Sequence, residues 1–401
     1  MSYLSAAVDF HDLPDEAAFR AEVRSFIERE LPDELRRREG VQGSFDRGSG
    51  WGRPAAKLWR KKLAGRAWTA PAWPKEYGGA GMSIMEQFVF NQEMAQARAP
   101  RTGGGIALGM AGPTIMLYGT DEQKQRFLPA ILSGEQIWCQ GFSEPEAGSD
   151  LAGLQTRAVR DGDDYVLNGQ KIWTSGAQHS QWMNVLARTD TDAPKHKGIS
   201  YFLLDMTSPG ITTRPLVNLV GEADFDEVFF DNVRIPSENL LGEENRGWYV
   251  ATATLDFERS NIASTTNLVL MVGDIVQWAK TKANDRLAQS PVLRYELADR
   301  MVEAEIGRLM SYRVISMQNA GELPNKEASI AKLYSSELEQ RIAGTAMRLL
   351  GSYAQLDNGH APMKGGVPRM YLYSVALTIG GGTSEIQRNI IAMRGLGMPR
   401  G

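Results

Sequence analysis

Apolar residues recur at helical spacing in the first third of the chain. Between residues 15 and 31 they fall at Phe19, Val23, Phe26, Ile27 and Leu31. This spacing makes one stripe of a 3.6-residue period and predicts a helix. Capping boxes at 83–86 and 120–123 predict two further helix starts, because a Ser or Thr is followed three residues later by Glu or Gln.

The pattern changes near residue 138, where short strand-like runs begin. Asp161-Gly162 and Asn168-Gly169 are dipeptides typical of hairpin turns, and they flank the runs 164–167 and 170–174. More strand-like runs follow at 185–187, 199–204 and 227–230. The helical period returns at Gly247, with segments over 247–283, 292–320 and 326–350 and a last one that begins at Thr383-Ser384.

The elements therefore come in the order α, β, α, without the alternation of strands and helices that a parallel doubly wound sheet needs. We expect an α+β fold with three domains. The expected boundaries are an N-terminal helical domain over 1–137, a β domain over 138–240 and a C-terminal helical domain over 241–401.

Composition excludes several function classes. The 44 Lys and Arg against 48 Asp and Glu leave a net charge of −4, which argues against nucleic acid or a polybasic membrane contact. The single cysteine, Cys139, cannot form an internal disulfide and indicates a reduced compartment. The four histidines lack metal-ligand spacing, so no metal is expected. With no signal segment and no apolar run near ~18 residues, we expect a cytoplasmic protein without a membrane span.

Two glycine-rich stretches could bind a nucleotide. Gly103–Gly109 follows a helical segment and not a strand, so close helix packing or a bend explains it better than a dinucleotide fingerprint. Gly380–Glu385 opens a helix, where backbone N–H groups can bind an anion such as a pyrophosphate. A simple capped turn is the more common explanation of such a stretch.

Hydroxyls and glycines crowd the stretch Gly141–Gly153, where the first helical part gives way to the strands. Ligand sites concentrate at such seams between domains. A second stretch, Lys171–Gly176, places Trp173 and two hydroxyls at the end of a strand. A lone Trp usually belongs to the core, but beside hydroxyl-rich turns it can face a planar aromatic cofactor.

A carboxylate occupies the apolar stripe of the segment 247–283. The stripe consists of Ala251, Leu255, Ile262 and Val269, and Glu258 lies among them. A buried carboxylate costs several kcal/mol unless it is paired, and desolvation raises its pKa. Two explanations stay open: an ion pair with Arg259 or another cation, or a general base tuned by burial.

These features together resemble the acyl-CoA dehydrogenase family over essentially the whole chain. The strongest likeness lies in Gly141–Gly153 (GFSEPEAGSDLAG), Asn168–Gly176 (NGQKIWTSG) and Gly381–Ile391 (GGTSEIQRNII), with support from Pro74–Gly81 and Gly112–Leu128. The resemblance implies the family's three-domain fold, with a β-barrel or sandwich in the middle and a C-terminal four-helix bundle. It also implies α,β-dehydrogenation of an acyl-CoA thioester with FAD, in lipid metabolism such as fatty-acid β-oxidation.

The resemblance also implies roles for single residues. Positions implied to contact FAD are Gln140, Phe142, Ser143, Ser149, Trp173, Ser175, Thr383 and Glu385. Positions implied to bind the acyl-CoA are Ser149, Asp256, Arg259 and the backbone N–H of Gly381. The implied partners are an electron-transfer flavoprotein as acceptor and other subunits of a homotetramer or heterotetramer.

The chain departs from the commonest family pattern at the catalytic base. Many members carry a Glu in a Tyr-Glu-Gly-Thr string, where this chain has Gly381. A subset that includes isovaleryl-CoA dehydrogenases carries the base in a Leu-Asp-x-Glu-Arg string, which Leu255–Arg259 matches. The resemblance thus implies Glu258 as the base, on a branched or bulky acyl chain.

Two other segments lack family motifs that reach the FAD of a neighbouring subunit. They are 281–288, which lacks Arg-x-x-Phe-Gly, and 348–352, which lacks Gln-x-x-Gly-Gly. Such losses occur in relatives that assemble as heteromers, often from sterol-degradation gene sets. A second hypothesis is therefore a non-catalytic or half-site subunit of a heteromeric dehydrogenase. A third is a relative with other flavin chemistry, of the nitroalkane oxidase or hydroxylase type.

Overall fold

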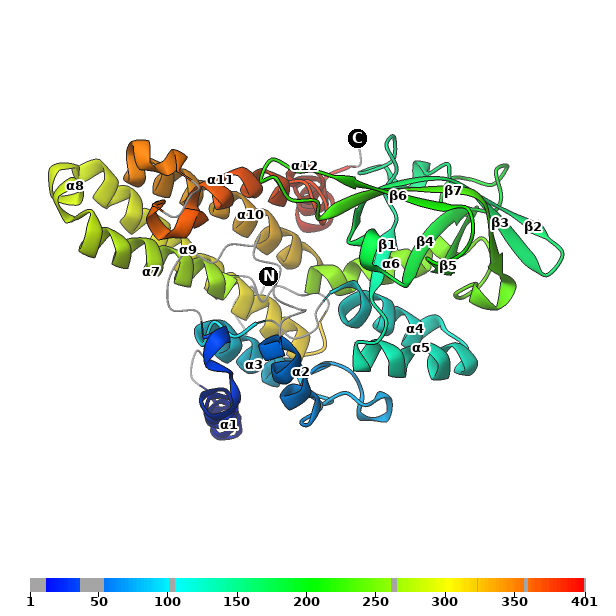
Figure 1. Ribbon diagram of the computed structural model, residues 1–401, viewed down its shortest axis with the longest axis horizontal. Helices are drawn as coiled ribbons and strands as arrows, with labels where there is room; N and C mark the ends of the chain where they lie inside the picture. The colour runs from blue at the N-terminus through cyan, green and yellow to red at the C-terminus, as the bar shows by residue number, and fades with distance from the viewer. Residues whose placement is uncertain are drawn as a thin grey trace. The chain divides into compact units, whose positions relative to one another are not determined.

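The computed structural model describes residues 12–36, 54–100, 105–260, 265–322, 324–356 and 360–399, and within them all side chains except those at 256–260, 265 and 284. The described chain forms two compact units that are not contiguous in sequence. One unit, here the helical unit, contains α1–α3 and α7–α12. The other, the β unit, contains α4–α6 and the strands β1–β7 (Figure 1).

Long helices form the helical unit. Its helices are α1 (Pro14–Glu30), α2 (Pro54–Ala64), α3 (Ile84–Gln96), α7 (Thr265–Lys282), α8 (Asn284–Gln289), α9 (Pro291–Asn319), α10 (Asn325–Leu350), α11 (Gly366–Leu377) and α12 (Ser384–Ile390). The apolar stripes of α7, α9 and α10 meet in one core, in which Val272, Leu338 and Ile342 are almost fully buried. Burial of these stripes stabilises helices that would be marginal alone.

A mixed sheet forms the centre of the β unit. Its strands are β1 (Trp138–Gly141), β2 (Arg157–Asp161), β3 (Asp164–Ser175), β4 (Trp182–Arg188), β5 (Ile199–Asp205), β6 (Ile211–Leu216) and β7 (Phe225–Pro236). Their order is β1-β4-β2-β3-β7-β6, and β5 pairs with β4. The helices of this unit are α4 (Gly112–Tyr118), α5 (Asp121–Ser133) and α6 (Gly247–Ser260). Strand β4 is buried along its whole length, including the polar residues Asn184 and Arg188.

The predicted order of elements is confirmed: helices, then strands, then helices. Both predicted capping boxes form. The Ser83 hydroxyl accepts from the N–H of Glu86, and the Thr120 hydroxyl accepts from the N–H of Gln123. The helical segment predicted over 247–283 carries two helices, α6 and α7. Of the glycine-rich stretch 103–109, the described residues belong to a π-helical turn at Ala107–Ala111 and the residues just before it.

One predicted hairpin turn is wrong. Asp161-Gly162 does join two strands, because Asp161 of β2 pairs with Asp164 of β3. Asn168-Gly169 instead lies inside β3, where the register with β7 shifts between Leu167 and Gly169. A Cβ atom at Gly169 would approach the Thr156 backbone within 2.7 Å, and the residue has a φ of +146°. Glycine serves here for a bulge and a close approach of two strands, not for a turn.

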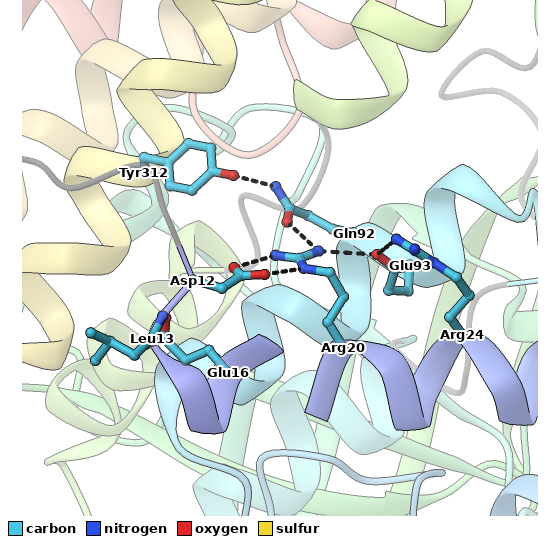
Figure 2. A network of polar contacts seen from close by, with 8 residues as sticks. All are labelled: Asp12, Leu13, Glu16, Arg20, Arg24, Gln92, Glu93 and Tyr312. Atoms are coloured by element: carbon cyan, nitrogen blue, oxygen red, sulfur yellow. Dashed lines mark hydrogen bonds and ion pairs between the residues drawn. The ribbon is translucent and has the colours of Figure 1, made fainter. Parts of the chain in front are cut away.

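A polar network joins three helices of the helical unit (Figure 2). Arg20 of α1 donates to Gln92 and Glu93 of α3 and to Asp12, with distances between 2.6 and 3.1 Å. Arg24 donates to the same Glu93 carboxylate, which is only 3% exposed. The Gln92 amide donates to the Tyr312 hydroxyl of α9 at 2.9 Å. Because both carboxylate oxygens of Glu93 are used, this one side chain fixes α1 on α3.

We predict that Glu93→Gln weakens the attachment of α1 by about 2 kcal/mol, because two guanidinium groups lose a buried anionic partner. Hydrogen exchange of the α1 amides should accelerate by roughly tenfold or more, which mass spectrometry can measure. Glu22→Gln is the matched control. Glu22 also lies on α1, and this change breaks only its exposed pair with Arg66, so it should cost less than about 1 kcal/mol. Equal effects of the two changes would contradict this role of Glu93.

Candidate functional site

Strand β1 and the loop after it carry four of the residues implied to contact FAD or acyl-CoA. Gln140 lies in β1, which runs parallel to β4, and Phe142 and Ser143 follow at its end. The Ser143 carbonyl accepts from the N–H of Ile172 in β3 at 3.0 Å. This bond brings Phe142 and Ser143 next to the strand that carries Trp173 and Ser175. Ser149 lies further along the same loop and is exposed.

The Phe142 ring is not itself a surface for a ligand. It is 5% exposed and meets the Tyr201 ring edge-to-face, with centroids 5.8 Å apart. The implied contact of this residue with a flavin would therefore have to use its backbone. The structure thus places the backbone of Phe142 and Ser143 near Trp173, whose aromatic side chain is exposed.

Trp173 has the geometry of a ligand-binding residue. Its φ is +60°, a left-handed conformation that costs a non-glycine residue of order 1–3 kcal/mol. It lies where the β3–β7 register shifts between Lys171 and Thr174, and 61% of its surface is exposed. Its ring meets Phe225 edge-to-face at 6.2 Å. The backbone of Trp173 is strained at a bulge, and its exposed indole ring offers a flat apolar face to a planar ligand.

A buried ion pair lies directly beneath this loop, and sequence reasoning did not single it out. Lys171 of β3 is fully buried, and its Nζ donates to Glu144 Oε1 at 2.8 Å and to the Phe142 carbonyl at 3.1 Å. Burial lowers the pKa of the Lys171 ammonium to about 8, although the Glu144 carboxylate opposes the shift. Burial acts to raise the pKa of Glu144. The Lys171 ammonium and the hydrogen bonds that the Glu144 carboxylate accepts nevertheless hold this pKa below its ordinary value.

A second buried polar cluster lies under α6. The Thr254 hydroxyl oxygen of α6 lies 2.9 Å from that of Thr114 of α4, and each hydroxyl is also within hydrogen-bond distance of a carbonyl four residues earlier in the chain. The Tyr201 hydroxyl of β5 lies beside them, and burial raises its pKa to about 12. Thr254 precedes position 258 by one helical turn. The cluster therefore fixes the part of α6 that leads to Glu258.

Three predicted residues lie outside the described side chains. The backbone of Asp256, Glu258 and Arg259 belongs to α6, but the structure gives no side-chain contacts for them. In the apolar stripe around Glu258, Ala251 is fully buried. The two explanations of Glu258, ion pair or general base, therefore remain predictions.

In the helical unit, the turn before α12 is held by side chains. Gly381 and Gly382 have φ values of +67° and +92°, which favour glycine. Lys332 of α10 donates to the Gly382 carbonyl at 2.7 Å and to the Leu377 carbonyl at 3.1 Å. The buried Gln387 amide donates to the Gly381 carbonyl at 3.2 Å. With these carbonyls bound from within the unit, the orientation of the peptide groups around Gly381 is fixed.

A polar cleft opens beside this turn, and each of its four arginines is paired with a glutamate. It has a volume of about 660 Å³, and Thr383 and Glu385 line it with four arginines, Arg300, Arg341, Arg348 and Arg388. The Thr383 hydroxyl caps α12 by accepting from the N–H of Ile386 at 3.2 Å. Hydrogen bonds from its own backbone N–H and from Thr383 lower the pKa of Glu385. Guanidinium groups, a hydroxyl and a carboxylate are the donors and acceptors that phosphates and a ribose need, so the residues present fit the adenosine end of FAD.

The two segments that lack cross-subunit motifs contact each other. Arg286 of α8 donates to the Arg348 carbonyl at the end of α10, at 2.9 Å. Its guanidinium also fills the space beside Gly351, where a Cβ would lie 2.5 Å from Nη1. Gly351 has a φ of +59°. Arg286 thus serves as a cap on the C-terminus of α10 within its own chain.

Within the described residues, His, Cys, Asp and Glu form no group of three that could hold a metal ion. No helix in that part of the chain is both long and apolar enough to cross a bilayer.

Comparison with known proteins identifies the family. The models of the acyl-CoA dehydrogenase N-terminal, middle and C-terminal domains match residues 14–135, 139–233 and 245–396. The chain therefore belongs to the acyl-CoA dehydrogenase family, which confirms the resemblance seen in its sequence. Members of this family are FAD-dependent oxidoreductases.

Several relatives are similar along nearly the whole chain. Acyl-CoA dehydrogenase FadE26 of Mycobacterium tuberculosis is 38% identical over 400 residues, covering 96% of this chain and 98% of the relative. A solved structure named Tcur3481-Tcur3483 steroid ACAD has a TM-score of 0.84 at 34% identity and covers 98% of this chain and 100% of its own. The ChsE4-ChsE5 complex from Mycobacterium tuberculosis has a TM-score of 0.80 at 36% identity, with coverage of 98% and 100%.

The glycine turn gives a stability prediction. Gly381→Ala should lower the free energy of unfolding by about 1–2 kcal/mol, because alanine resists a left-handed φ. Gly380→Ala is the matched control. A Cβ there meets only the Ala376 carbonyl at an ordinary 3.6 Å, so the change should be neutral or stabilise by up to about 1 kcal/mol. Calorimetry of the cofactor-free protein measures both, and a Gly381→Ala protein as stable as the control would contradict the strained turn.

Proposed function

We propose that this chain catalyses the FAD-dependent α,β-dehydrogenation of an acyl-CoA thioester to the trans-2-enoyl-CoA, with Glu258 as the base. The observation that carries this proposal is Gly381. A left-handed glycine occupies the loop position where many relatives have their catalytic Glu, so the loop provides no carboxylate. The Leu255–Arg259 string then supplies the carboxylate from α6.

In this proposal Glu258 removes the α-proton of the thioester. A thioester α-proton is a far weaker acid than a carboxylic acid, so the developing enolate oxygen must be stabilised by hydrogen-bond donors, each worth a few kcal/mol. The Gly381 N–H is one such donor, and Lys332 and Gln387 hold its turn in place. FAD, when bound, accepts the β-hydrogen as hydride. Phe142, Ser143, Ser149, Trp173 and Ser175 would hold its flavin end, and Thr383 and Glu385 its adenosine end.

We also propose a bulky acyl chain as the substrate, which fits the steroid ACAD among the similar structures. The chain offers small residues before α4, and a Cβ at Gly105 would meet no atom within 4 Å. Asp256, Arg259 and Ser149 would contact the acyl-CoA, and an electron-transfer flavoprotein would reoxidise the cofactor.

Glu258→Gln tests the base. Because a positioned general base contributes typically 10²–10⁴-fold, flavin reduction in a single turnover should slow by at least about 100-fold. FAD content and acyl-CoA binding should remain. Glu243→Gln is the control, since Glu243 is an exposed carboxylate just before the same helix, and its reduction rate should equal that of the parent. Flavin reduction at the parent rate in Glu258→Gln would refute the assignment.

A half-site subunit of a heteromeric dehydrogenase is the second candidate. This candidate is favoured by the hydrogen bond from Arg286 to the Arg348 carbonyl. The bond joins the two segments that lack cross-subunit motifs to each other within the chain. The ChsE4-ChsE5 complex among the similar structures agrees with a heteromer.

Expression alone and together with a dehydrogenase encoded by a neighbouring gene separates the two candidates. The half-site candidate predicts fewer FAD molecules than chains, bound only in the co-expressed complex. A yellow, active protein with one FAD per chain when expressed alone would exclude an obligate heteromer. Absorbance at the flavin band, divided by protein concentration, is the measurement.

A further inference from the structure

Lys171 and Glu144 join three segments of the β unit. The Lys171 ammonium has three donors, and two of them bind the loop after β1, at the Phe142 carbonyl and the Glu144 carboxylate. Glu144 in turn accepts from the N–H groups of Gln155 at 2.6 Å and Thr156 at 2.9 Å. One ion pair thereby connects the β1 loop, the strand β3 and the segment before β2.

The residues implied to face the flavin lie next to these anchor points. Phe142 is itself bound by Lys171, and Ser143 lies between the two anchored residues. On the other side, Ile172 follows Lys171 and donates its N–H to Ser143, and Trp173 follows in its strained conformation. A movement of the Lys171 side chain would therefore displace the backbone of Phe142 and Ser143 relative to Trp173.

Burial makes this connection rigid. Lys171 is 0% and Glu144 7% exposed, so water cannot replace either partner without opening the loop. A buried ion pair held by several hydrogen bonds has one favourable geometry, and removing one partner leaves an uncompensated charge. Replacing both partners by neutral residues of similar shape, in contrast, often leaves stability nearly unchanged. A role in stability and a role in positioning can therefore be separated by experiment.

We propose that Lys171 and Glu144 are positioning residues for the flavin: the pair sets the backbone of Phe142 and Ser143 against Trp173, and so determines how tightly and in what orientation the flavin ring is bound. This inference rests on the proposed FAD-dependent function. It assigns neither residue to the chemistry, because neither would touch the reacting atoms.

The test compares three variants with the parent protein in the form that binds FAD, alone or with its partner. Lys171→Met removes the donor to the Phe142 carbonyl. The double change Lys171→Met with Glu144→Gln removes both charges and keeps an acceptor for the Gln155 and Thr156 N–H groups. Glu144→Asp keeps the charge but withdraws it by one methylene group. Arg234→Met is the control, because it removes exposed pairs with Asp161 and Asp164 at the opposite end of β3.

The readouts are the FAD dissociation constant, the absorption spectrum and fluorescence of the bound flavin, and hydrogen exchange at the Ile172 amide. We expect the double variant to unfold at nearly the parent temperature yet to bind FAD about tenfold or more weakly, with a shifted spectrum and faster exchange at Ile172. Glu144→Asp should change in the same direction by less, and Arg234→Met should match the parent.

Three outcomes overturn the inference. A folded double variant with the parent FAD affinity and spectrum would show that the pair only stabilises the sheet. If Lys171→Met and the double variant do not fold, an unchanged flavin spectrum in Glu144→Asp would likewise show that the pair only stabilises the sheet. In both cases the proposed function survives, because the parent still binds FAD. A parent protein that binds no FAD, alone or with its partner, overturns the proposed function together with the inference.

Discussion

The ion pair of Lys171 with Glu144 is the contact on which the candidate site of the β unit depends. An ammonium cannot remain charged inside a sheet unless the fold supplies acceptors, and here both acceptors come from the loop after β1. The loop therefore has to return to β3. Trp173 can keep a left-handed backbone because its neighbours on both sides are held, Ile172 by its bond to the Ser143 carbonyl and Thr174 by renewed pairing with β7.

The same principle acts in the helical unit with a different donor. There the turn before α12 exposes carbonyl groups, and Lys332 and Gln387 donate to them. The turn needs a left-handed backbone at two consecutive residues, a conformation that glycine adopts without strain. Glycine at position 381 suits the backbone but excludes a side-chain carboxylate. The left-handed geometry of this turn and the absence of a carboxylate at position 381 are thus two aspects of one constraint.

The arginines of the helical unit make contacts of two kinds. Four of them line a cleft with Thr383 and Glu385, where the charge and hydroxyl suit a nucleotide. Arg286, on α8, instead caps the end of α10 from within the chain. Family membership therefore defines the fold and the class of chemistry, whereas the contacts of single arginines differ between these two places in the unit.

The sequence by itself determined the helices, their capping boxes and the order α, β, α, because these follow from contacts between residues only a few positions apart. It also pointed to the loop of Ser143 and the strand of Trp173, which the sheet brings together. It misjudged Asn168-Gly169 and did not single out Lys171. A bulge in β3 depends on the register with β7 and on Thr156, and the burial of a lysine depends on a carboxylate 27 positions away. Such pairings join distant segments, so only the tertiary structure decided them.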